Sequence, residues 1–362
     1  MNENKVNSEV EETLSEDYSC PSCGAPIKFD PSTSTLECSY CGFRKIIDGA
    51  SSDEEYDFNS EYEDNSWNDE AKVVKCENCS AKNIIDKKAI TSTCPFCGSN
   101  QVVDTNELSG IKPQRVIPFK LNNVDAQNKY HTWIKKRFFT PSQIKKQKVN
   151  TNISGVYLPI WTFDTETLSH YNGRLGKHYT VVRGSGKNRR VETRVRWYRI
   201  SGIQKVSFDD IPVNAGEKIS QNEISQLLPY DTNNSFIYEK DFLVGFSAEH
   251  YNVDLKEGWN KAKGIAAPTI KNQILRKYIY DVVGYINIKT NYSDITYKYV
   301  LIPVWIGNYT YKNKKYRYLV NGETGKLIGK APTSILKVLI VVFGVILIAA
   351  AIMLLAFFSG TF

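Results

Sequence analysis

Eight cysteines are the residues of this sequence whose type and spacing most directly suggest chemistry. They form four CxxC pairs, which fall into two sets with the same internal spacing. Fourteen residues separate the two pairs of each set, and the second set repeats the first 56 positions later. The cysteines are Cys20, Cys23, Cys38, Cys41, Cys76, Cys79, Cys94 and Cys97. The sequence therefore contains an internal repeat.

Each set offers four soft thiolate ligands, which suit tetrahedral zinc in a closed structural site, although the spacer is one residue shorter than usual. A disulfide framework is the alternative. The opening residues MNENKVNSEVEE show no apolar stretch after a basic start, so we expect a reducing compartment. A redox role is disfavoured because no βαβ pattern surrounds any pair, and catalytic zinc because four thiolates leave no open position. We predict two zinc ions per chain.

Short hairpins are predicted to present these cysteines. Glycine follows three of the four pairs, at Gly24, Gly42 and Gly98, where a positive φ turns backbone amides toward the sulfurs. Ser80 stands in the fourth such place. The expected strands cover residues 27–29, 35–37, 83–86 and 89–93. Both units are predicted to be zinc ribbons.

Acidic residues concentrate before the second ribbon. Through Glu70 the chain carries 18 acidic and 4 basic residues, a net charge of −14, whereas the remainder carries 21 acidic and 42 basic residues, a net charge of +21. Ten carboxylates and no Lys or Arg lie within 46–71, which predicts a solvated linker. Its aromatic residues Tyr56, Phe58, Tyr62 and Trp67 leave a second hypothesis open, in which this segment docks into a basic groove of a partner or of this chain.

An uncharged run of 21 residues covers 338–358. As a helix it would extend roughly 31 Å, the thickness of a bilayer core. We therefore predict one transmembrane helix at 335–358. Lys326, Lys330 and Lys337 precede the run and no basic residue follows it. The positive-inside rule then predicts a single-pass protein of the cell membrane, with the bulk of the chain cytoplasmic and the C-terminus outside.

Residues 113–330 are predicted to form a β-rich α+β domain. One helix is expected over 124–138, with an apolar face that runs from Ala126 through Tyr130 to Phe138. A second is expected after Asp254, because Glu257 completes a capping-box pattern. Pro268 should break or kink that helix.

Two segments of this domain resemble each other. VYLPIW from Val156 matches VLIPVW from Val300 at an offset of 144. An internal duplication is one explanation and chance similarity in a Tyr-rich β domain is the other. In either case we expect the prolines on edge strands or at bulges, because proline cannot donate a ladder hydrogen bond.

The remaining motifs do not predict catalysis. The turns at 184–187 and 322–326 lack the first glycine and the Ser/Thr of a P-loop, so both are predicted to be hairpin turns. The four histidines show no metal-ligand spacing, and the sequence has no GxSxG elbow. Asp209 and Asp210 could act as general acid and base, but adjacent carboxylates are common. We therefore predict that the protein is not an enzyme.

A basic cluster centres on residues 183–199. The residues predicted to contact phosphates or lipids are Arg183, Lys187, Arg189, Arg190, Arg194, Arg196, Arg199, Lys330 and Lys337. Anionic lipids attract such side chains at about 1 kcal/mol each near a membrane surface. A solvated strand face is the alternative.

Several segments carry a resemblance to a known family. They are CPSCGAPIKFD from Cys20, CPFCG from Cys94, VIPFK from Val116, GVYLPIWTFD from Gly155, GFSAEHYNVD from Gly245 and YSDITYKYVLIPVW from Tyr292. In these segments the chain resembles bacterial proteins with a transcription-factor-IIB-type zinc ribbon, some labelled replication-restart helicase-like. The resemblance spans most of residues 20–330. It implies tandem ribbons, a β-rich body of unassigned role and, in some members, a membrane segment and genes near the phage-shock stress system.

The patterns together predict a multidomain protein. Its parts are an acidic disordered tail at 1–19, zinc ribbons at 20–45 and 72–104, an acidic linker at 46–71, the α+β domain at 113–330 and the transmembrane helix at 335–358. We expect a scaffold that crosses the lipid bilayer once and binds protein partners at the membrane. A membrane-tethered nucleic-acid binder ranks second, because ten carboxylates beside the ribbons would repel a polyanion.

Overall fold

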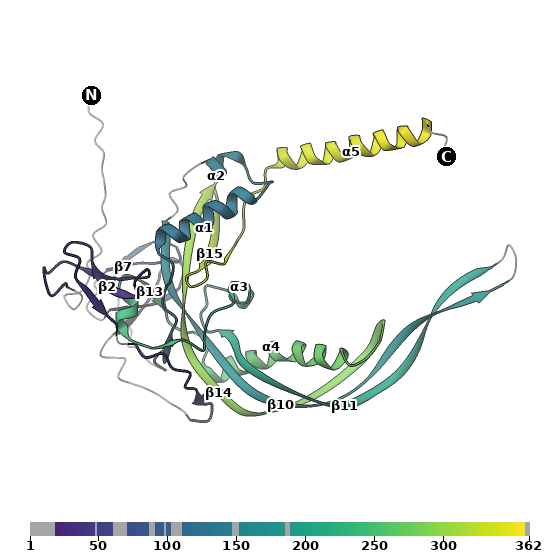
Figure 1. Cartoon of the computed structure of the whole chain (residues 1–362), viewed down its shortest axis with the longest axis horizontal. Coiled ribbons are helices and arrows are strands. Elements are labelled where there is room, and N and C mark those ends of the chain that lie inside the picture. The colour runs from purple at the N-terminus through teal and green to yellow at the C-terminus, as the bar shows by residue number, and fades with distance from the viewer. Residues whose placement is uncertain are drawn as a thin grey trace.

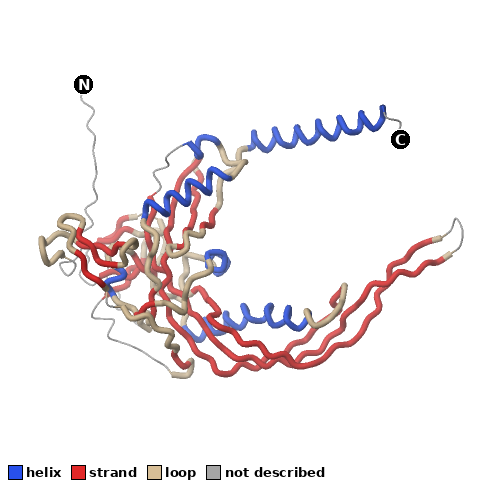
Figure 2. Tube along the Cα trace, viewed as in Figure 1, coloured by secondary structure: helices blue, strands red, loops and turns tan. Residues whose placement is uncertain are grey.

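Two very long antiparallel strands form the centre of the structure. The structure is a computed structural model that describes residues 19–47, 49–60, 71–86, 91–97, 99–102, 111–146, 152–184 and 189–358. These strands are β10 (Asn152–Arg183) and β14 (Val282–Tyr311), which pair along much of their length. They belong to an 11-stranded sheet. Figures 1 and 2 show them curving along the body, with β10 continuing beyond β14 into an arm.

Shorter strands complete this sheet on both sides of the central pair. β11 (Arg190–Asn214) pairs with β10, and β15 (Lys314–Asn321) pairs with β14 and with β16 (Leu327–Gly329). The short partners are β4 (Tyr56–Asp57), β9 (Arg115–Val116), β12 (Phe236–Ile237) and β13 (Ser247–Glu249). The turn at 322–326 joins β15 to β16, as predicted, whereas most of the turn at 184–187 lies outside the described residues.

Side chains of β10 alternate between two buried faces, which explains its nearly continuous apolar run. Tyr157, Trp161 and Phe163 lie in one core cluster, which also contains Trp259. Val156, Leu158 and Ile160 lie in a second cluster on the opposite face. A strand that is covered on both faces has no solvent side on which polar residues would alternate.

The helices are α1 (Asn123–Lys136), α2 (Ser142–Lys146), α3 (Gln221–Leu227), the 3₁₀ turn η4 (Lys240–Leu243), α4 (Leu255–Leu275) and α5 (Ile335–Phe358). Helix α1 lies within one residue of its predicted start at 124, ends two residues before the predicted 138, and buries Ala126 and Tyr130. Phe138, expected on its apolar face, lies beyond the helix end and is 66% exposed.

Asp254 caps α4 by accepting a hydrogen bond from the Glu257 amide, as the sequence predicts. Of the predicted break or kink at Pro268, the break is wrong, because α4 continues through this residue to Leu275. Pro268 lies on the exposed side of the helix. Water can therefore bind the Gly264 carbonyl that proline leaves without its donor.

Pro159 and Pro303 lie in the two central strands, and not at edges or bulges as predicted. Each proline lies where two neighbouring strands on the outer side of its own strand leave a gap between them. β13 and β11 flank the gap beside Pro159, and β9 and β15 flank the one beside Pro303. The proline carbonyls accept hydrogen bonds from the amides of Ala215 and Gly322, at 3.1 and 2.8 Å. The equivalent environments of Pro159 and Pro303 are what an internal duplication would produce, and the duplication itself stays a prediction.

Residues 49–60, predicted to belong to a solvated linker, pack against the body. β4 pairs with Thr296 and Tyr297 of β14, and the Phe58 ring lies 5.9 Å from that of Trp259. The described part of this segment thus follows the second hypothesis, docking onto the chain itself, because its aromatic rings find apolar partners there. Tyr62, Trp67 and the tail at 1–18 lie outside the described residues.

Candidate metal centres and basic arm

The first four cysteines meet at the end of a three-stranded sheet formed by β1 (Ile27–Asp30), β2 (Thr35–Cys38) and β3 (Arg44–Ile46). The Sγ atoms of Cys20 and Cys41 are 3.5 Å apart, and those of Cys23 and Cys38 are 3.6 Å apart. All four lie within 4.8 Å of one another. A tetrahedral ion with 2.3 Å bonds to sulfur needs sulfurs about 3.8 Å apart, so this cluster fits one metal ion.

Tight turns after the CxxC pairs create this geometry. The Gly24 amide donates to the Cys20 carbonyl at 2.8 Å, and the Gly42 amide donates to the Cys38 carbonyl at 2.9 Å. Both glycines have a positive φ, at 74° and 73°, as the sequence predicts. Ser80 adopts the same conformation with φ of 60°, whereas Gly98 lies outside the described residues.

The second four cysteines form an equivalent cluster between two hairpins. The Sγ atoms of Cys76 and Cys97, and those of Cys79 and Cys94, are 3.6 Å apart. The hairpins are β5 (Ala71–Lys75) with β6 (Lys82–Asp86), and β7 (Thr91–Thr93) with β8 (Asn100–Val102). The predicted pairing of 83–86 with 89–93 is wrong, because β6 lies between β5 and β13 and has no free edge for β7.

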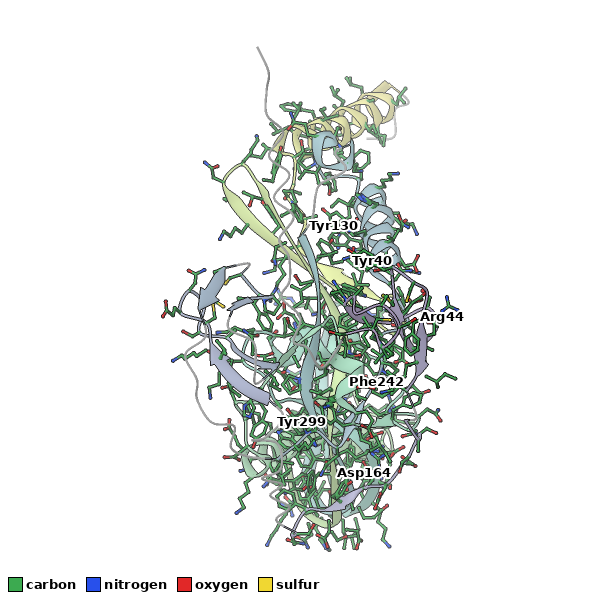
Figure 3. The ribbon with its side chains drawn as sticks, turned by 90° about the vertical axis from the view of Figure 1, so that its left-hand side faces the viewer. Tyr40, Arg44, Tyr130, Asp164, Phe242 and Tyr299 are labelled. Atoms are coloured by element: carbon green, nitrogen blue, oxygen red, sulfur yellow. The ribbon has the colours of Figure 1, made fainter. Side chains whose placement is uncertain are left out.

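The second cluster is joined to the body through that β13–β6 contact. Ala248 pairs with Ile84, and the His250 amide donates to the Lys82 carbonyl at 3.1 Å. Ribbon 1 keeps its own sheet. It touches the body through the Phe29 amide, which donates to the Val244 carbonyl at 3.1 Å, and through side chains, with the Phe29 ring 5.7 Å from that of Phe242. Figure 3 shows Tyr40 on this ribbon and Phe242 beneath it. The two ribbons therefore differ in how they join the body, because ribbon 2 shares its sheet and ribbon 1 does not.

The cysteine environments shift the thiol pKa values in both directions. Hydrogen bonds from the backbone amides of Cys41 and Tyr40 lower the pKa of Cys38 to about 7. Burial raises the pKa of Cys97, but hydrogen bonds from Ser99 outweigh it and bring the value to about 6. Burial and neighbouring thiols raise the pKa of Cys79, since gathered thiolates repel one another until a cation neutralises them. These donors fit two small zinc-binding modules.

Most of the predicted basic cluster lies on one hairpin, formed by β10 and β11. Its described members are exposed: Arg183, Arg189, Arg190, Arg194, Arg196 and Arg199. Lys187 lies outside the described residues. Lys330 and Lys337 do not join this hairpin, because they flank the start of α5.

A third group of ligand atoms comes from Glu55, Asp164 and Asp209, within 4.8 Å of one another. Lys298 already provides a positive charge beside them, with Nζ 3.0 Å from Glu55 Oε1 and 3.1 Å from Asp210 Oδ1. Burial, reinforced by Glu55, raises the pKa of Asp164 to about 8. Sequence reasoning considered only the adjacent Asp209 and Asp210, because the other members come from distant segments.

Helix α5 is long and apolar enough to cross a membrane. Its window Ile335–Leu355 has a mean hydropathy of 3.3, and none of it is buried in the described structure. Where α5 leaves the body, Lys337 Nζ donates to the carbonyls of Phe138 and Thr140, at 3.3 and 2.7 Å. The rings of Phe138 and Phe139 are exposed beside this point.

The chain is similar to a bacterial protein of about the same extent. It is 29% identical over 323 residues to "Uncharacterized protein YdjG" of Bacillus subtilis (strain 168), which covers 88% of this chain and 90% of the relative. Such a span includes much of the body. No protein-family model matches the chain. No solved structure matches it either.

Proposed function

We propose that this protein is a single-pass membrane protein with two structural zinc ribbons that serves as a non-enzymatic scaffold or adaptor. It recruits protein partners to the cytoplasmic face of the cell membrane. The uncovered helix α5 carries the proposal, since a 21-residue span with a mean hydropathy of 3.3 is unfavourable in water and long enough for a bilayer core. The family resemblance suggests that the recruitment belongs to an envelope-stress response.

The residues around the start of α5 support this orientation. Phe138 and Phe139 suit the membrane interface, where aromatic side chains concentrate. Lys330 and Lys337 lie at the same end of the helix, and positive charge marks the cytoplasmic side. The β-rich body is then cytoplasmic, where its thiols stay reduced and available to zinc.

Ribbon 1 supplies a surface for a protein partner. Tyr40, in the turn between Cys38 and Cys41, is 81% exposed, and Ile46 at the end of β3 is 73% exposed. Tyrosine is enriched at the centres of protein interfaces because it buries a large ring with little loss of entropy. A zinc ion holds this turn rigid and thereby fixes the direction of the Tyr40 ring.

Affinity capture of the full chain from detergent-solubilised membranes tests the proposal. Tyr40→Ala should lose partners that the parent chain captures, and Cys38→Ser should lose the same set because it removes the zinc-held turn. Tyr285→Ala removes a half-exposed tyrosine of β14 and is the matched control. Identical partner sets from the parent chain and both ribbon variants would contradict recruitment through ribbon 1.

Extraction of membranes with alkaline carbonate tests the anchor separately. The parent chain should stay in the membrane pellet, and a chain that lacks residues 335–358 should be released. Release of the parent chain would contradict the spanning helix. Elemental analysis of the purified chain should find two zinc ions, and a value near zero would contradict the ribbons.

A further inference from the structure

The outer part of the β10–β11 hairpin has no third layer. The last pair between β10 and β14 is Gly176 with Val282, and beyond it β10 pairs only with β11 among the described residues. We call residues 176–183 and 190–197 the distal arm. An isolated two-stranded hairpin is at best marginally stable in water. The distal arm should therefore be stable only when another surface covers it.

The register between β10 and β11 divides the distal arm into two chemically different faces. In an antiparallel pair, opposite residues share a face and the faces alternate along each strand. One face carries the opposite pairs Lys177 with Arg196, Tyr179 with Arg194, Val181 with Glu192, and Arg183 with Arg190. The other carries Gly176 with Trp197, His178 with Val195, Thr180 with Thr193, and Val182 with Val191. The arm is thus amphipathic, with a basic face and a mainly apolar face.

The basic face holds more positive charge than its own carboxylate can balance. Like charges directly opposite each other destabilise a sheet, and two such pairs occur, Lys177 with Arg196 and Arg183 with Arg190. Glu192 is the one carboxylate on this face of the described arm. It lies 3.1 Å from Arg194 and 3.8 Å from Arg183. An external anionic surface would relieve the remaining repulsion.

The apolar face exposes side chains that water does not favour. Val182 and Val191, directly opposite each other near the tip, are 48% and 65% exposed. Trp197 sits at the base of this face, where a Cβ on Gly176 would lie 3.0 Å from its ring. The Arg174 guanidinium lies 5.1 Å from the centre of the same ring. A tryptophan beside an arginine suits the boundary between lipid headgroups and acyl chains.

We infer that the distal arm docks onto the anionic leaflet that α5 enters, an inference that rests on the proposed function. Its apolar face enters the headgroup boundary, and its arginines lie near the lipid phosphates. Figure 1 shows the arm and α5 leaving the body toward the same side. Residues 330–334 join β16 to α5 outside any helix or strand. The membrane thus supplies both the missing layer and the missing negative charge.

Protease protection of the full chain in vesicles tests this inference. A glutamate-specific protease cuts after Glu192, and mass spectrometry measures that cut relative to cuts elsewhere in the chain. Cleavage should be slow in vesicles with 30% phosphatidylglycerol and fast in pure phosphatidylcholine. Arg183→Gln and Arg190→Gln should accelerate it about fivefold for each arginine removed, the equivalent of about 1 kcal/mol per charge. Val182→Ser with Val191→Ser should accelerate it too, because docking needs both faces.

Matched variants and conditions identify the cause of any change. Lys75→Gln with Lys240→Gln removes two exposed charges outside the arm and should leave cleavage in anionic vesicles slow. All variants should be cut at the parent rate in neutral vesicles. A variant that is cut faster there has an unfolded arm, and its faster cleavage in anionic vesicles then does not report on lipid docking. High salt should remove the protection in anionic vesicles.

Three results would overturn the inference. Equal cleavage in neutral and anionic vesicles would show that lipid does not cover the arm. Equal protection in both would assign the cover to another protein surface. Protection in neutral vesicles only after addition of duplex DNA would assign the arm to nucleic acid. Chains that alkaline carbonate extracts from the vesicles would instead refute the anchor, so failure of the arm and failure of the proposed function are distinguishable.

Discussion

Replacing Lys298 with methionine should strongly destabilise the body. Lys298 lies on β14 with 1% of its side chain exposed, and three carboxylates surround its Nζ. Two come from the acidic segment, Asp53 at 3.5 Å and Glu55 at 3.0 Å, and the third is Asp210 at 3.1 Å. Thr296 also donates a hydrogen bond to Glu55. The lysine thus holds residues 53–55 against the sheet, together with Arg115, which donates to the Glu54 carbonyl at 3.0 Å.

The expected magnitude follows from the burial of these partners. Asp53 is 70% exposed, so its ion pair contributes little. Glu55 and Asp210 are mostly buried, so Lys298→Met would leave their carboxylates without the buried counter-charge beside them. Removing one member of a buried pair costs about 3–5 kcal/mol. At about 2–4 °C for each kcal/mol in a domain of this size, the Tm should fall by about 6–20 °C. Methionine has a similar length, so little of this loss would come from a cavity.

Thermal unfolding of the detergent-solubilised full chain, followed by tryptophan fluorescence, measures this effect. Lys289→Met is the matched control, because Lys289 lies on the same strand and is exposed, and its Tm should change little. Adding Glu55→Gln and Asp210→Asn to Lys298→Met should recover part of the loss, since the uncompensated charges are then removed. Equal Tm values for Lys298→Met and Lys289→Met would refute a charge-clamped acidic segment.

Three further predictions concern the core, the metal centres and the sheet. Burial raises the pKa of Asp164 from an ordinary 3.8 to about 8, so the folded state holds a proton that the unfolded state releases. The free energy of unfolding should therefore fall as pH rises between about 4 and 8. Asp164→Asn should reduce this pH dependence, as measured by urea unfolding. Cys38→Ser and Cys94→Ser should each lower zinc content from two ions to one, but the second should lower the Tm of the body more, because β6 belongs to the large sheet. Gly307→Ala should lower the urea midpoint by an amount equivalent to about 1–3 kcal/mol, because its Cβ would meet the Tyr318 ring at 2.0 Å.

Short-range patterns were sufficient wherever the chemistry lies within one turn or one helix. The spacing of Cys20, Cys23 and their repeats predicted both clusters, because a CxxC turn presents two sulfurs without help from distant residues. Asp254 and Glu257 predicted the start of α4 for the same reason. The composition of 338–358 predicted α5, because crossing a bilayer depends on length and apolarity alone.

Pairings between distant segments were not predictable from these patterns. The carboxylates at 53–55 suit a solvated linker as well as a docked one, and the choice depends on Thr296 and Lys298, about 240 residues further along the chain. The β6 pattern likewise does not reveal that β13 occupies its edge. Pro159 and Pro303 were expected at edges because the sequence does not show where neighbouring strands leave a gap.

The sequence by itself determined the two cysteine clusters, the starts of α1 and α4, the apolar span and the existence of a basic cluster. The tertiary structure alone decided that ribbon 2 joins the large sheet, that residues 49–60 pack onto the body and that Arg183, Arg190, Arg194 and Arg196 line one face of an arm. The physical reason is range. Ligand spacing, capping and hydropathy act within a few residues, whereas strand order and burial depend on contacts that the whole chain forms together.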